Sequence, residues 1–427
     1  MLLMYYGRRN RRGSMAYKTE NTLDLRKKRY EDALALKEPD RVPFAPKMGK
    51  SYSQLGGISN YEATTDFRNL KESIRLFLEK YELDCFRLPS LYPISVMEVL
   101  GTNYIKWPGA THGLELNALH QIIDRSYLAE DEYDEFLNDP TAYIFTKVFP
   151  DRHDKLQGLR KLDLSNIIEF GHFMSMAPFA DPEVRQALLT LMFAGEQVAK
   201  FQQQQAEISA IAAEMQAPSY PTVGQPMAYD MLADNLRGYI NVPMDLFTCP
   251  EKVLAATEYF QWQCEKALRK AAAIGRKFVY IPLHGGTDDF MSNETYNKYY
   301  WPFLRRMIEL CVELDMTPQV FCEGKYDTRL EILAEVPKGK VMYMFENVDM
   351  ARAKKILGGV ACITGQVSSA DLIYGKKEDV IEQTKRYIDI CAPGGGFIMD
   401  CSITLDIYKE ENLEAWYETT LKYGVYK

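Results

Sequence analysis

The chain has 427 residues, of which 47 % are hydrophobic and 26 % charged, and its formal net charge is −8. These values are ordinary for a globular protein and exclude disordered, collagen-like and fibrous classes. The acidic balance, without any basic tract, argues against a nucleic-acid partner. No apolar stretch approaches the roughly 20 residues that a membrane helix needs, so no membrane partner is expected.

The first residues resemble a leader or a tag. Apolar residues 1–6 are followed by four arginines but by no apolar core, so the segment is not an export signal. Residues 1–15 are expected to be disordered, and residues 16–427 to form one domain. The eight cysteines are dispersed without Cys-x-x-Cys spacing, which favours reduced thiols in the cytoplasm over a disulfide framework.

Strand-like and helix-like segments alternate along most of the chain, which indicates βα units and a parallel sheet. In chain order the predicted elements are a helix at 21–37, a strand at 41–45, a helix at 66–81, a strand at 83–87, a long helix at 183–215, a strand at 217–223, a helix from Pro250 to Gly275, a strand at 276–283, a helix at 292–314, a strand at 317–321, a helix at 327–335, a strand at 340–345, a helix at 349–357, a strand at 360–364, a helix at 377–391, a strand at 395–399 and a helix at 410–422.

About eight strands with intervening helices fit an α/β fold of the (β/α)₈ TIM-barrel type better than an open sheet. Residues 104–216 are too many for a single βα unit. They are predicted to form a mostly helical insertion on the catalytic face. Its long helix at 183–215 is also compatible with plain packing against the barrel.

In βα barrels the active site gathers where the strands end. The candidates are therefore the residues that follow each predicted strand, namely Lys47, Arg87, Gln225, His284, Glu323, Glu346, Gln366 and Cys401.

His284 lies in Pro282-Leu-His-Gly-Gly-Thr-Asp-Asp289. The two glycines let the backbone come close to a ligand. Asp288 and Asp289 are placed to orient the imidazole or to accept protons. His284 and Asp288 are therefore candidate catalytic residues, although a hydrogen-bonded turn histidine and a helix-capping aspartate would give the same pattern.

Two carboxylates follow adjacent strands, Glu323 in Phe321-Cys-Glu-Gly324 and Glu346 in Met344-Phe-Glu-Asn347. Such a pair can bind a metal or share a proton, or it can form structural ion pairs with neighbouring cations. Cys401 directly follows the last strand, where a thiolate can ligate zinc. Simple burial is the alternative for this cysteine.

Several segments together resemble the uroporphyrinogen decarboxylase-like superfamily of barrels. The resemblance covers about residues 21–103 and 217–427, and it is carried by Leu36–Pro43, Asp234–Gly238 with Asp245, Pro250–Val253, Trp301-Pro302, Ala392–Ile398 and Glu411–Leu413. True decarboxylases have an arginine-rich segment after the first strand, which grips the carboxylates of the substrate. Here residues 47–53 contain no arginine, and residues 89–92 stand where the essential aspartate is expected. Both departures disfavour decarboxylation, which remains an alternative.

The other branch of this superfamily comprises methyltransferases that work with corrinoid proteins and bind zinc at the barrel mouth. Members acting on coenzyme M have His-x-Cys-Gly where this chain has Phe321–Gly324, and Cys401 falls near their last ligand. Oxygen ligands leave zinc a stronger Lewis acid, which suits an ether oxygen. The resemblance implies Zn²⁺ held by some of His284, Glu323, Glu346 and Cys401.

The sequence therefore predicts an O-demethylating methyltransferase. It would move a methyl group from a small methoxylated compound, such as a methoxyaromatic, to the cobalt of a corrinoid (cobalamin) on a partner protein. His284, Asp288 and Glu323 are its predicted catalytic residues, and the resemblance also implies a homodimer. The alternatives are decarboxylation, methyl transfer from a methylcorrinoid to a pterin or thiol, and a non-catalytic binding barrel.

Overall fold

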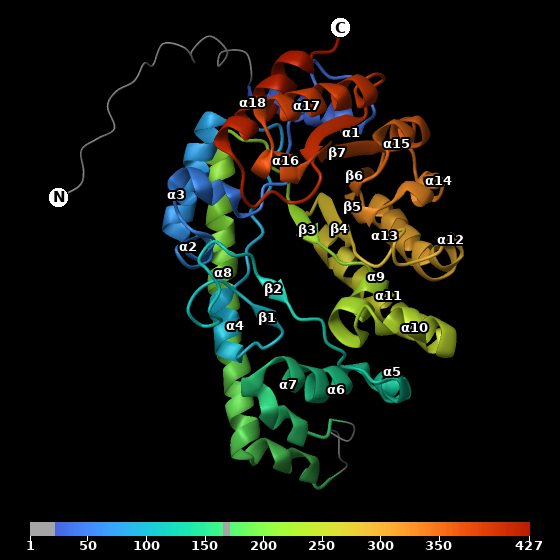
Figure 1. Cartoon of the computed structure of the whole chain (residues 1–427). Helices are drawn as coiled ribbons and strands as arrows, with labels where there is room; N and C mark the ends of the chain where they lie inside the picture. The colour runs from blue at the N-terminus through green and yellow to red at the C-terminus, as the bar shows by residue number, and fades with distance from the viewer. Residues whose placement is uncertain (1–21, 165–170) are drawn as a thin grey trace, which may run out of the picture.

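The computed structural model describes residues 22–164 and 171–427 (Figure 1). Residues 1–15, which the sequence predicts to be leader-like, lie outside the described residues. Within the described part of the chain, no helix combines the length and the apolar composition needed to cross a membrane.

Six strands form one parallel sheet and pair in chain order. They are β3 (Thr222–Gly224), β4 (Phe278–Leu283), β5 (Thr317–Lys325), β6 (Met342–Asn347), β7 (Cys362–Val367) and β8 (Phe397–Cys401). All six lie at or within a few residues of predicted strands. Each run is rich in β-branched, aromatic or other apolar residues and is followed by a helical pattern, as expected of βα units.

Two extended segments close this sheet into a ring, and they lie where the sequence predicts its first two strands. The closing hydrogen bonds run from Met399 N–H to the Pro43 carbonyl (2.9 Å), from Ala45 N–H to the Met399 carbonyl (3.2 Å), from Asp84 N–H to the Phe44 carbonyl (2.9 Å) and from Phe86 N–H to the Pro218 carbonyl (2.6 Å). The ring of eight extended segments is the predicted (β/α)₈ barrel.

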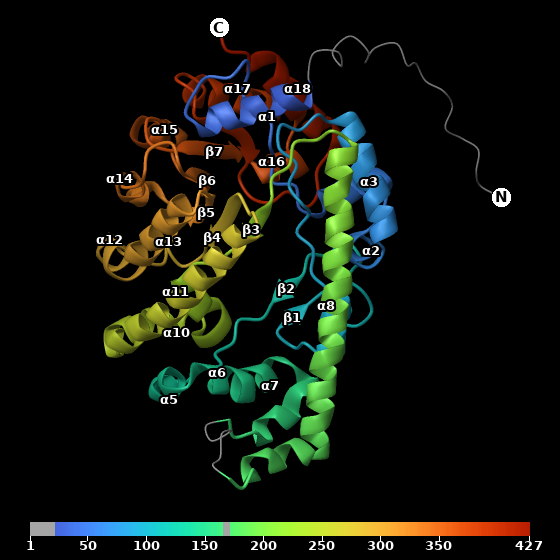
Figure 2. The same ribbon diagram turned by 180° about the vertical axis from the view of Figure 1, so that it is seen from behind.

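Helices surround the ring (Figures 1 and 2). They are α1 (Leu23–Leu34), α2 (Asn60–Thr65), α3 (Phe67–Lys80), α9 (Ala228–Leu232), α10 (Asn241–Thr248), α11 (Pro250–Ala273), α12 (Asn293–Thr295), α13 (Trp301–Glu313), α14 (Leu330–Leu333), α15 (Met350–Leu357), α16 (Ser369–Tyr374), α17 (Lys377–Cys391) and α18 (Glu410–Tyr423). Their buried faces follow helical spacing, as in α3 with Leu70, Ile74 and Phe77.

Alternate residues of each strand face opposite sides of the barrel wall. One set packs inside the barrel with Tyr30 of α1, and it comprises Ala45, Cys85, Phe278, Phe321, Met342, Met344, Cys362 and Ile398. The other set packs toward the surrounding helices in the main core, and it includes Val279, Ile281, Val320, Cys322, Phe345, Ile363, Met399 and Cys401. This alternation decides which residues at the strand ends reach the mouth of the barrel.

A long insertion leaves the barrel after the second extended segment and returns at β3. It contains α4 (Ile94–Leu100), the antiparallel pair β1 (Ile105–Lys106) and β2 (Gln121–Ile122), α5 (Tyr133–Asn138), α6 (Pro140–Tyr143), α7 (Phe149–Arg152) and α8 (Pro182–Glu214). The 33 residues of α8 run along most of the molecule in both ribbon views. Asp181 caps this helix, since its carboxylate accepts the Glu183 N–H at 2.8 Å.

Candidate functional site

His284 directly follows β4, and its imidazole is held from one side. Its Nδ1 lies 2.9 Å from Asp234 Oδ2 and 3.1 Å from the hydroxyl of Tyr239. Burial opposes a charge on this ring, but the hydrogen bond and charge of Asp234 outweigh burial and raise the pKa of His284 to about 9. The imidazole is therefore protonated at neutral pH.

The backbone at the end of β4 is fixed by a second aspartate, Asp230 of α9. The N–H groups of His284 and Gly285 each donate to its carboxylate at 2.9 Å, and the Tyr300 hydroxyl donates to it at 2.7 Å. Burial raises the pKa of Asp230 to about 6. A Cβ atom at position 285 would lie 2.9 Å from Asp230 Oδ1, so this close approach requires glycine.

The other imidazole nitrogen faces Glu323, which lies near the end of β5. His284 Nε2 is 3.6 Å from Glu323 Oε2, and the Glu323 side chain is 50 % exposed. Partial burial raises the pKa of Glu323, the charge of Glu346 adds to this rise, and the charge of His284 opposes it. The structure thus brings the predicted residues His284 and Glu323 together.

Glu346, near the end of β6, completes an acidic group at this side of the mouth. Its Oε2 accepts the Gly324 N–H at 2.6 Å, so the glutamate is tied to the turn that follows Glu323. Gly324 has a φ of 81°, a conformation that favours glycine. Glu346 therefore lies beside Glu323, as predicted from adjacent strand ends.

Asp288 does not orient His284. Its carboxylate accepts the backbone N–H of Thr328 at 3.0 Å and the Thr328 hydroxyl at 2.8 Å, and it lies 3.5 Å from Arg329 Nε. These contacts join the loop after β4 to the segment after β5. The orienting role that the sequence suggested for Asp288 belongs to Asp234.

Cys401 is the one predicted metal ligand that the structure leaves apart from the others. Its side chain is fully buried in the main core, and its Sγ lies 3.0 Å from the Ile403 carbonyl. Burial and the nearby Asp400 charge raise the pKa of this thiol to about 12. The sequence predicts that the last strand ends at residue 399, whereas β8 runs through Cys401 and directs Asp400, not Cys401, toward the interior.

Across residues 22–164 and 171–427, no group of three or more histidine, cysteine, aspartate or glutamate side chains is arranged to hold a metal ion. His284, Glu323 and Glu346 lie near one another, but their present positions do not form a closed ligand set.

Two other strand-end candidates have structural contacts. The side-chain amide of Gln225 donates to Cys264 Sγ at 3.2 Å and to the Pro226 carbonyl at 3.1 Å. The side-chain amide of Gln366 makes two hydrogen bonds with the backbone of Val348. It accepts the Val348 N–H at 3.2 Å and donates to the Val348 carbonyl at 2.7 Å. Both glutamines bind neighbouring segments of the wall.

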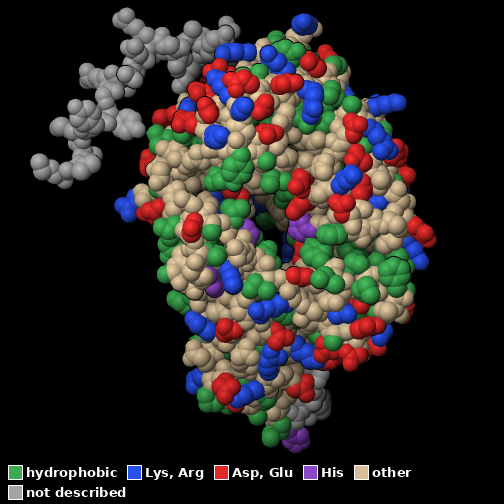
Figure 3. Space-filling view, in the orientation of Figure 1, with side chains coloured by type: hydrophobic (Ala, Val, Ile, Leu, Met, Phe, Trp, Pro, Cys, Tyr) green, Lys and Arg blue, Asp and Glu red, His purple; other side chains and the backbone are tan. Residues whose placement is uncertain are grey.

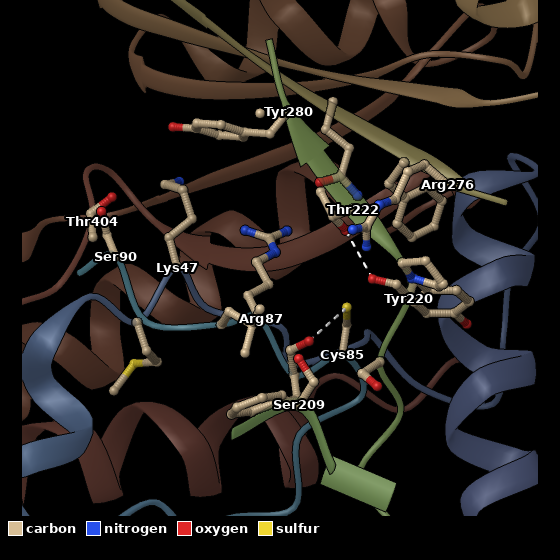
Figure 4. Close-up of a pocket in the computed structure, with 18 residues that line it drawn as sticks. Lys47, Cys85, Arg87, Ser90, Ser209, Tyr220, Thr222, Arg276, Tyr280 and Thr404 are labelled. Carbon is tan, nitrogen blue, oxygen red and sulfur yellow. Dashed lines mark hydrogen bonds between the residues drawn. The ribbon is translucent and has the colours of Figure 1, made fainter. Parts of the chain in front are cut away.

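Lys47 and Arg87, the remaining candidates, line a cavity of about 600 Å³. Lys47 Nζ lies 3.1 Å from Asp400 Oδ2 and donates to the Cys401 carbonyl at 2.8 Å. Arg87 Nη1 lies 3.3 Å from the same Asp400 oxygen. Figure 4 shows the guanidinium of Arg87 among Lys47, Tyr280 and Thr222, and Figure 3 shows the molecule hollowed near its centre, with charged side chains around the opening.

The pattern of predicted strand ends does not single out Asp230, Asp234, Tyr239 or Asp400. A signal existed for Asp234, since it opens the Asp234–Gly238 motif. In that motif Arg237 pairs with Asp245, with its Nε 2.6 Å from Oδ2, and thereby supports the segment that carries Asp234. For Asp400 the signal was the two-residue period of β8, in which it follows the inward-facing Ile398.

The fold resembles that of a methyltransferase from Methanosarcina mazei, with a TM-score of 0.60 and 15 % sequence identity over 95 % of this chain and 99 % of that one. A B12-independent methionine synthase from Shewanella sp. W3-18-1, 13 % identical over 49 % of this chain and 61 % of that one, gives a TM-score of only 0.34. The first likeness concerns the fold alone, and the second is too weak to use. No curated protein matches the chain.

The sequence also matches the model of a protein family, uroporphyrinogen decarboxylase (URO-D), over residues 178–423. This match spans more than half of the chain, from the start of the long insertion helix to the last helix of the barrel. It includes β3 to β8 and with them Asp230, Asp234, His284, Glu323 and Glu346. The chain therefore belongs to the uroporphyrinogen decarboxylase (URO-D) family.

Proposed function

We propose that this protein is a corrinoid-dependent O-demethylating methyltransferase. It takes the methyl group of a small methoxylated compound and delivers it to the cobalt of a corrinoid carried by a partner protein. The observation that carries the proposal is an imidazole at the barrel mouth that is held by Asp234 on Nδ1 and faces Glu323 with Nε2, in surroundings that raise the pKa of His284. The fold shared with a methyltransferase is consistent with it.

The chemistry explains why such a group is needed. A corrinoid in its cobalt(I) state supplies the nucleophile that accepts the methyl group. The carbon–oxygen bond of the ether then breaks, and its electron pair goes to oxygen. An alkoxide or phenolate is a poor leaving group at neutral pH, so this oxygen has to receive a proton or an equivalent positive charge. In the proposal, His284 donates that proton from Nε2.

Asp234 prepares His284 for this role in two ways. Its hydrogen bond fixes the orientation of the ring, so that Nε2 points to the mouth, and its charge keeps the ring protonated. Glu323 lies beside Nε2 and is half exposed, so it is in contact with both the imidazole and solvent. It is the group through which a proton returns to His284 after each transfer.

Zinc was the other source of positive charge that the sequence suggested. One feature fits it, because a metal-binding histidine usually has its second nitrogen held by a carboxylate, as Asp234 holds His284. The set as a whole does not fit, because Cys401 faces the core and the remaining side chains do not form a three-ligand site in the described residues. The proposal therefore assigns no step to a metal, and the zinc content of the purified protein tests that expectation separately.

A spectroscopic experiment tests the proposed function. The protein is mixed under anaerobic conditions with cob(I)alamin and 2-methoxyphenol, and both the cobalt spectrum and the phenolic product are followed. The proposal predicts conversion of cobalt(I) to methylcobalt with an equal amount of demethylated phenol. Release of CO₂ from a porphyrinogen acid without any corrinoid would identify a decarboxylase instead. If His284→Ala left the transfer intact, the assigned site would be wrong.

A further inference from the structure

One face of the long insertion helix α8 is apolar and exposed. The helix packs through its other face, which includes Ala187, against η4 (Asp154–Lys161). Leu189, Met192 and Phe193 lie on the opposite face and keep 51 %, 67 % and 49 % of their surface exposed. Apolar side chains that gather on one exposed face, unlike single exposed ones, mark a contact with another molecule.

A charged residue stands at each end of this apolar stripe. The order along the helix is Arg185, Leu189, Met192 and Glu196, and the spacings of four, three and four residues keep all of them on one face. Both charged side chains are exposed, and within residues 22–164 and 171–427 neither has an ion-pair partner. Eleven residues of helix rise by about 16 Å, so Arg185 and Glu196 of one chain cannot pair with each other.

This arrangement is complementary to itself when a second copy of α8 lies antiparallel to the first. Leu189 then meets Met192 of the partner subunit, and Arg185 meets Glu196 of the partner subunit. The two-fold axis repeats each contact, so the apolar layers lie in the middle and an ion pair closes each end. The stripe therefore matches a second copy in both hydrophobicity and charge.

The position of α8 leaves room for such a contact. In both ribbon views the first half of α8, at its lower end, runs along the outer edge of the molecule (Figures 1 and 2). Gly195 lies beside the stripe, and a Cβ atom there would meet nothing within 4 Å. A glycine inside a helix lowers helix stability, and no contact among the described residues requires this one. Its missing side chain lets a second helix come close.

We propose that the protein is a homodimer in which the two α8 helices pack antiparallel through Leu189, Met192 and Phe193. Arg185 pairs with Glu196 of the partner subunit at both ends of the contact. A single pair of helices makes a small interface for a specific complex, so the dimer should dissociate on dilution, with a dissociation constant on the order of micromolar. The inference does not depend on the proposed function, because none of these residues belongs to the site around His284.

Sedimentation velocity of the full-length protein over a dilution series tests the inference. Wild type is expected to sediment with twice the 49.2 kDa of the chain at high concentration and as a monomer when diluted. Met192→Asp places a charge in the apolar layer and should give monomers throughout. Met244→Asp is the matched control, since Met244 is 61 % exposed on α10, across the molecule from α8 (Figure 1), and it should leave the dimer unchanged.

An exchange of charges tests the antiparallel arrangement. Arg185→Glu and Glu196→Arg each turn two attractive pairs into two repulsive ones, and each should raise the dissociation constant roughly 10- to 100-fold. The double variant restores opposite charges across the contact and should return to the wild-type value. Because the two residues cannot meet within one chain, only a contact between two copies produces this recovery.

A wild-type protein that stays monomeric at high concentration would overturn the inference and assign the stripe to a different protein. A dimer that a folded Met192→Asp protein retains would also overturn it. Single charge variants that weaken the dimer, without recovery in the double variant, would exclude the antiparallel packing. Circular dichroism verifies that each variant is folded, and if Met192→Asp fails to fold, the charge exchange decides.

Discussion

Asp234 Oδ2 lies 2.9 Å from Nδ1 of His284, and this contact links α9 and the segment after it to the end of β4. Both residues lie at the mouth of the barrel, 50 positions apart in the sequence. The pair makes the imidazole a cation at neutral pH and leaves Nε2 directed at Glu323. Proton donation at the mouth depends on this relationship.

The pH dependence of methyl transfer follows from the raised pKa of His284. Because the protonated imidazole is the active form, the rate should hold through neutral pH and fall as the pH rises through about 9. In Asp234→Asn the negative charge is lost and only a neutral amide oxygen remains to accept from Nδ1, so the falling limb should move toward the ordinary histidine value. Rate profiles of both proteins between neutral and alkaline pH check this. An unmoved limb in the variant would exclude His284 as the titrating acid.

The same shift makes a prediction about stability. The pKa of His284 is higher in the folded protein than its ordinary value of 6.5, so protonation favours the folded state. This stabilising contribution should be complete below about pH 6.5 and should disappear as the pH rises through about 9. Urea denaturation of wild type and His284→Gln across this range measures it. The difference between the two proteins should shrink with rising pH, and a constant or growing difference would be inconsistent with the raised pKa.

Asp84 holds the first two segments of the barrel together. Its fully buried carboxylate lies 2.5 Å from Arg29 Nη1 and 2.7 Å from Arg41 Nη1, and it accepts the Phe44 N–H at 2.7 Å. Removing one partner of a buried ion pair leaves uncompensated charge and costs about 3–5 kcal/mol. Asp84→Ala should therefore lower the free energy of unfolding by about this amount in denaturant titrations.

Asp389→Ala provides the control for Asp84→Ala. The Asp389 carboxylate accepts an exposed hydrogen bond from the Tyr423 hydroxyl, at 2.9 Å. This substitution should change stability by less than about 0.5 kcal/mol. Similar losses in the two variants would show that burial of the Asp84 network does not determine barrel closure.

Gly324 joins the two glutamates at the mouth. A Cβ atom there would lie 2.7 Å from Thr287 Oγ1, and the φ of 81° is strained for any other residue. Gly324→Ala should lower the free energy of unfolding by more than the roughly 1–2 kcal/mol that a left-handed backbone conformation alone costs. It should also displace the Gly324 N–H, which donates to Glu346. Gly57→Ala has a comparable φ of 67° with nothing within 4 Å, so it should lose stability but keep full methyl transfer. Equal activity of the two variants would argue against a role for this turn.

Cys401 faces the core, so its thiol should be irrelevant to any metal bound at the mouth. Cys401→Ala is expected to keep the metal content and the rate of wild type, with a small loss of stability from the missing buried sulfur. Elemental analysis and rate measurements of the purified variant check this. Loss of zinc in Cys401→Ala, but not in the equally buried Cys322→Ala, would restore Cys401 as a ligand.

The barrel was predictable because its pattern is repetitive. Six strands and most surrounding helices lie where the alternating apolar runs predict them. The segments at 41–45 and 83–87 also lie in the barrel wall, but they make too few backbone hydrogen bonds with their neighbours to form full strands. The pairing of His284 with Glu323 followed from adjacent strand ends. The orientation of Cys401 could not be predicted without knowing where β8 ends, because side chains alternate along a strand. An error of one residue in the strand therefore assigns a side chain to the wrong face.

The aspartates that hold His284 were missed for a different reason. Asp230 and Asp234 lie about 50 residues earlier, on a helical segment that only tertiary packing brings against β4. Periodicity describes each element by itself and does not say which loops meet. Asp288, four residues after His284, was favoured by sequence proximity, but its carboxylate is occupied by Thr328.

The central claim is that His284 protonates the departing oxygen, and a comparison of leaving groups tests it most directly. Single-turnover transfer to cob(I)alamin is measured for wild type and His284→Gln with 2-methoxyphenol and with 4-nitrophenyl methyl ether, whose leaving group needs little protonation. The account predicts that the variant loses roughly 10²–10⁴-fold with 2-methoxyphenol and far less with the nitrophenyl ether. Equal losses with the two ethers, or no loss with either, would contradict it.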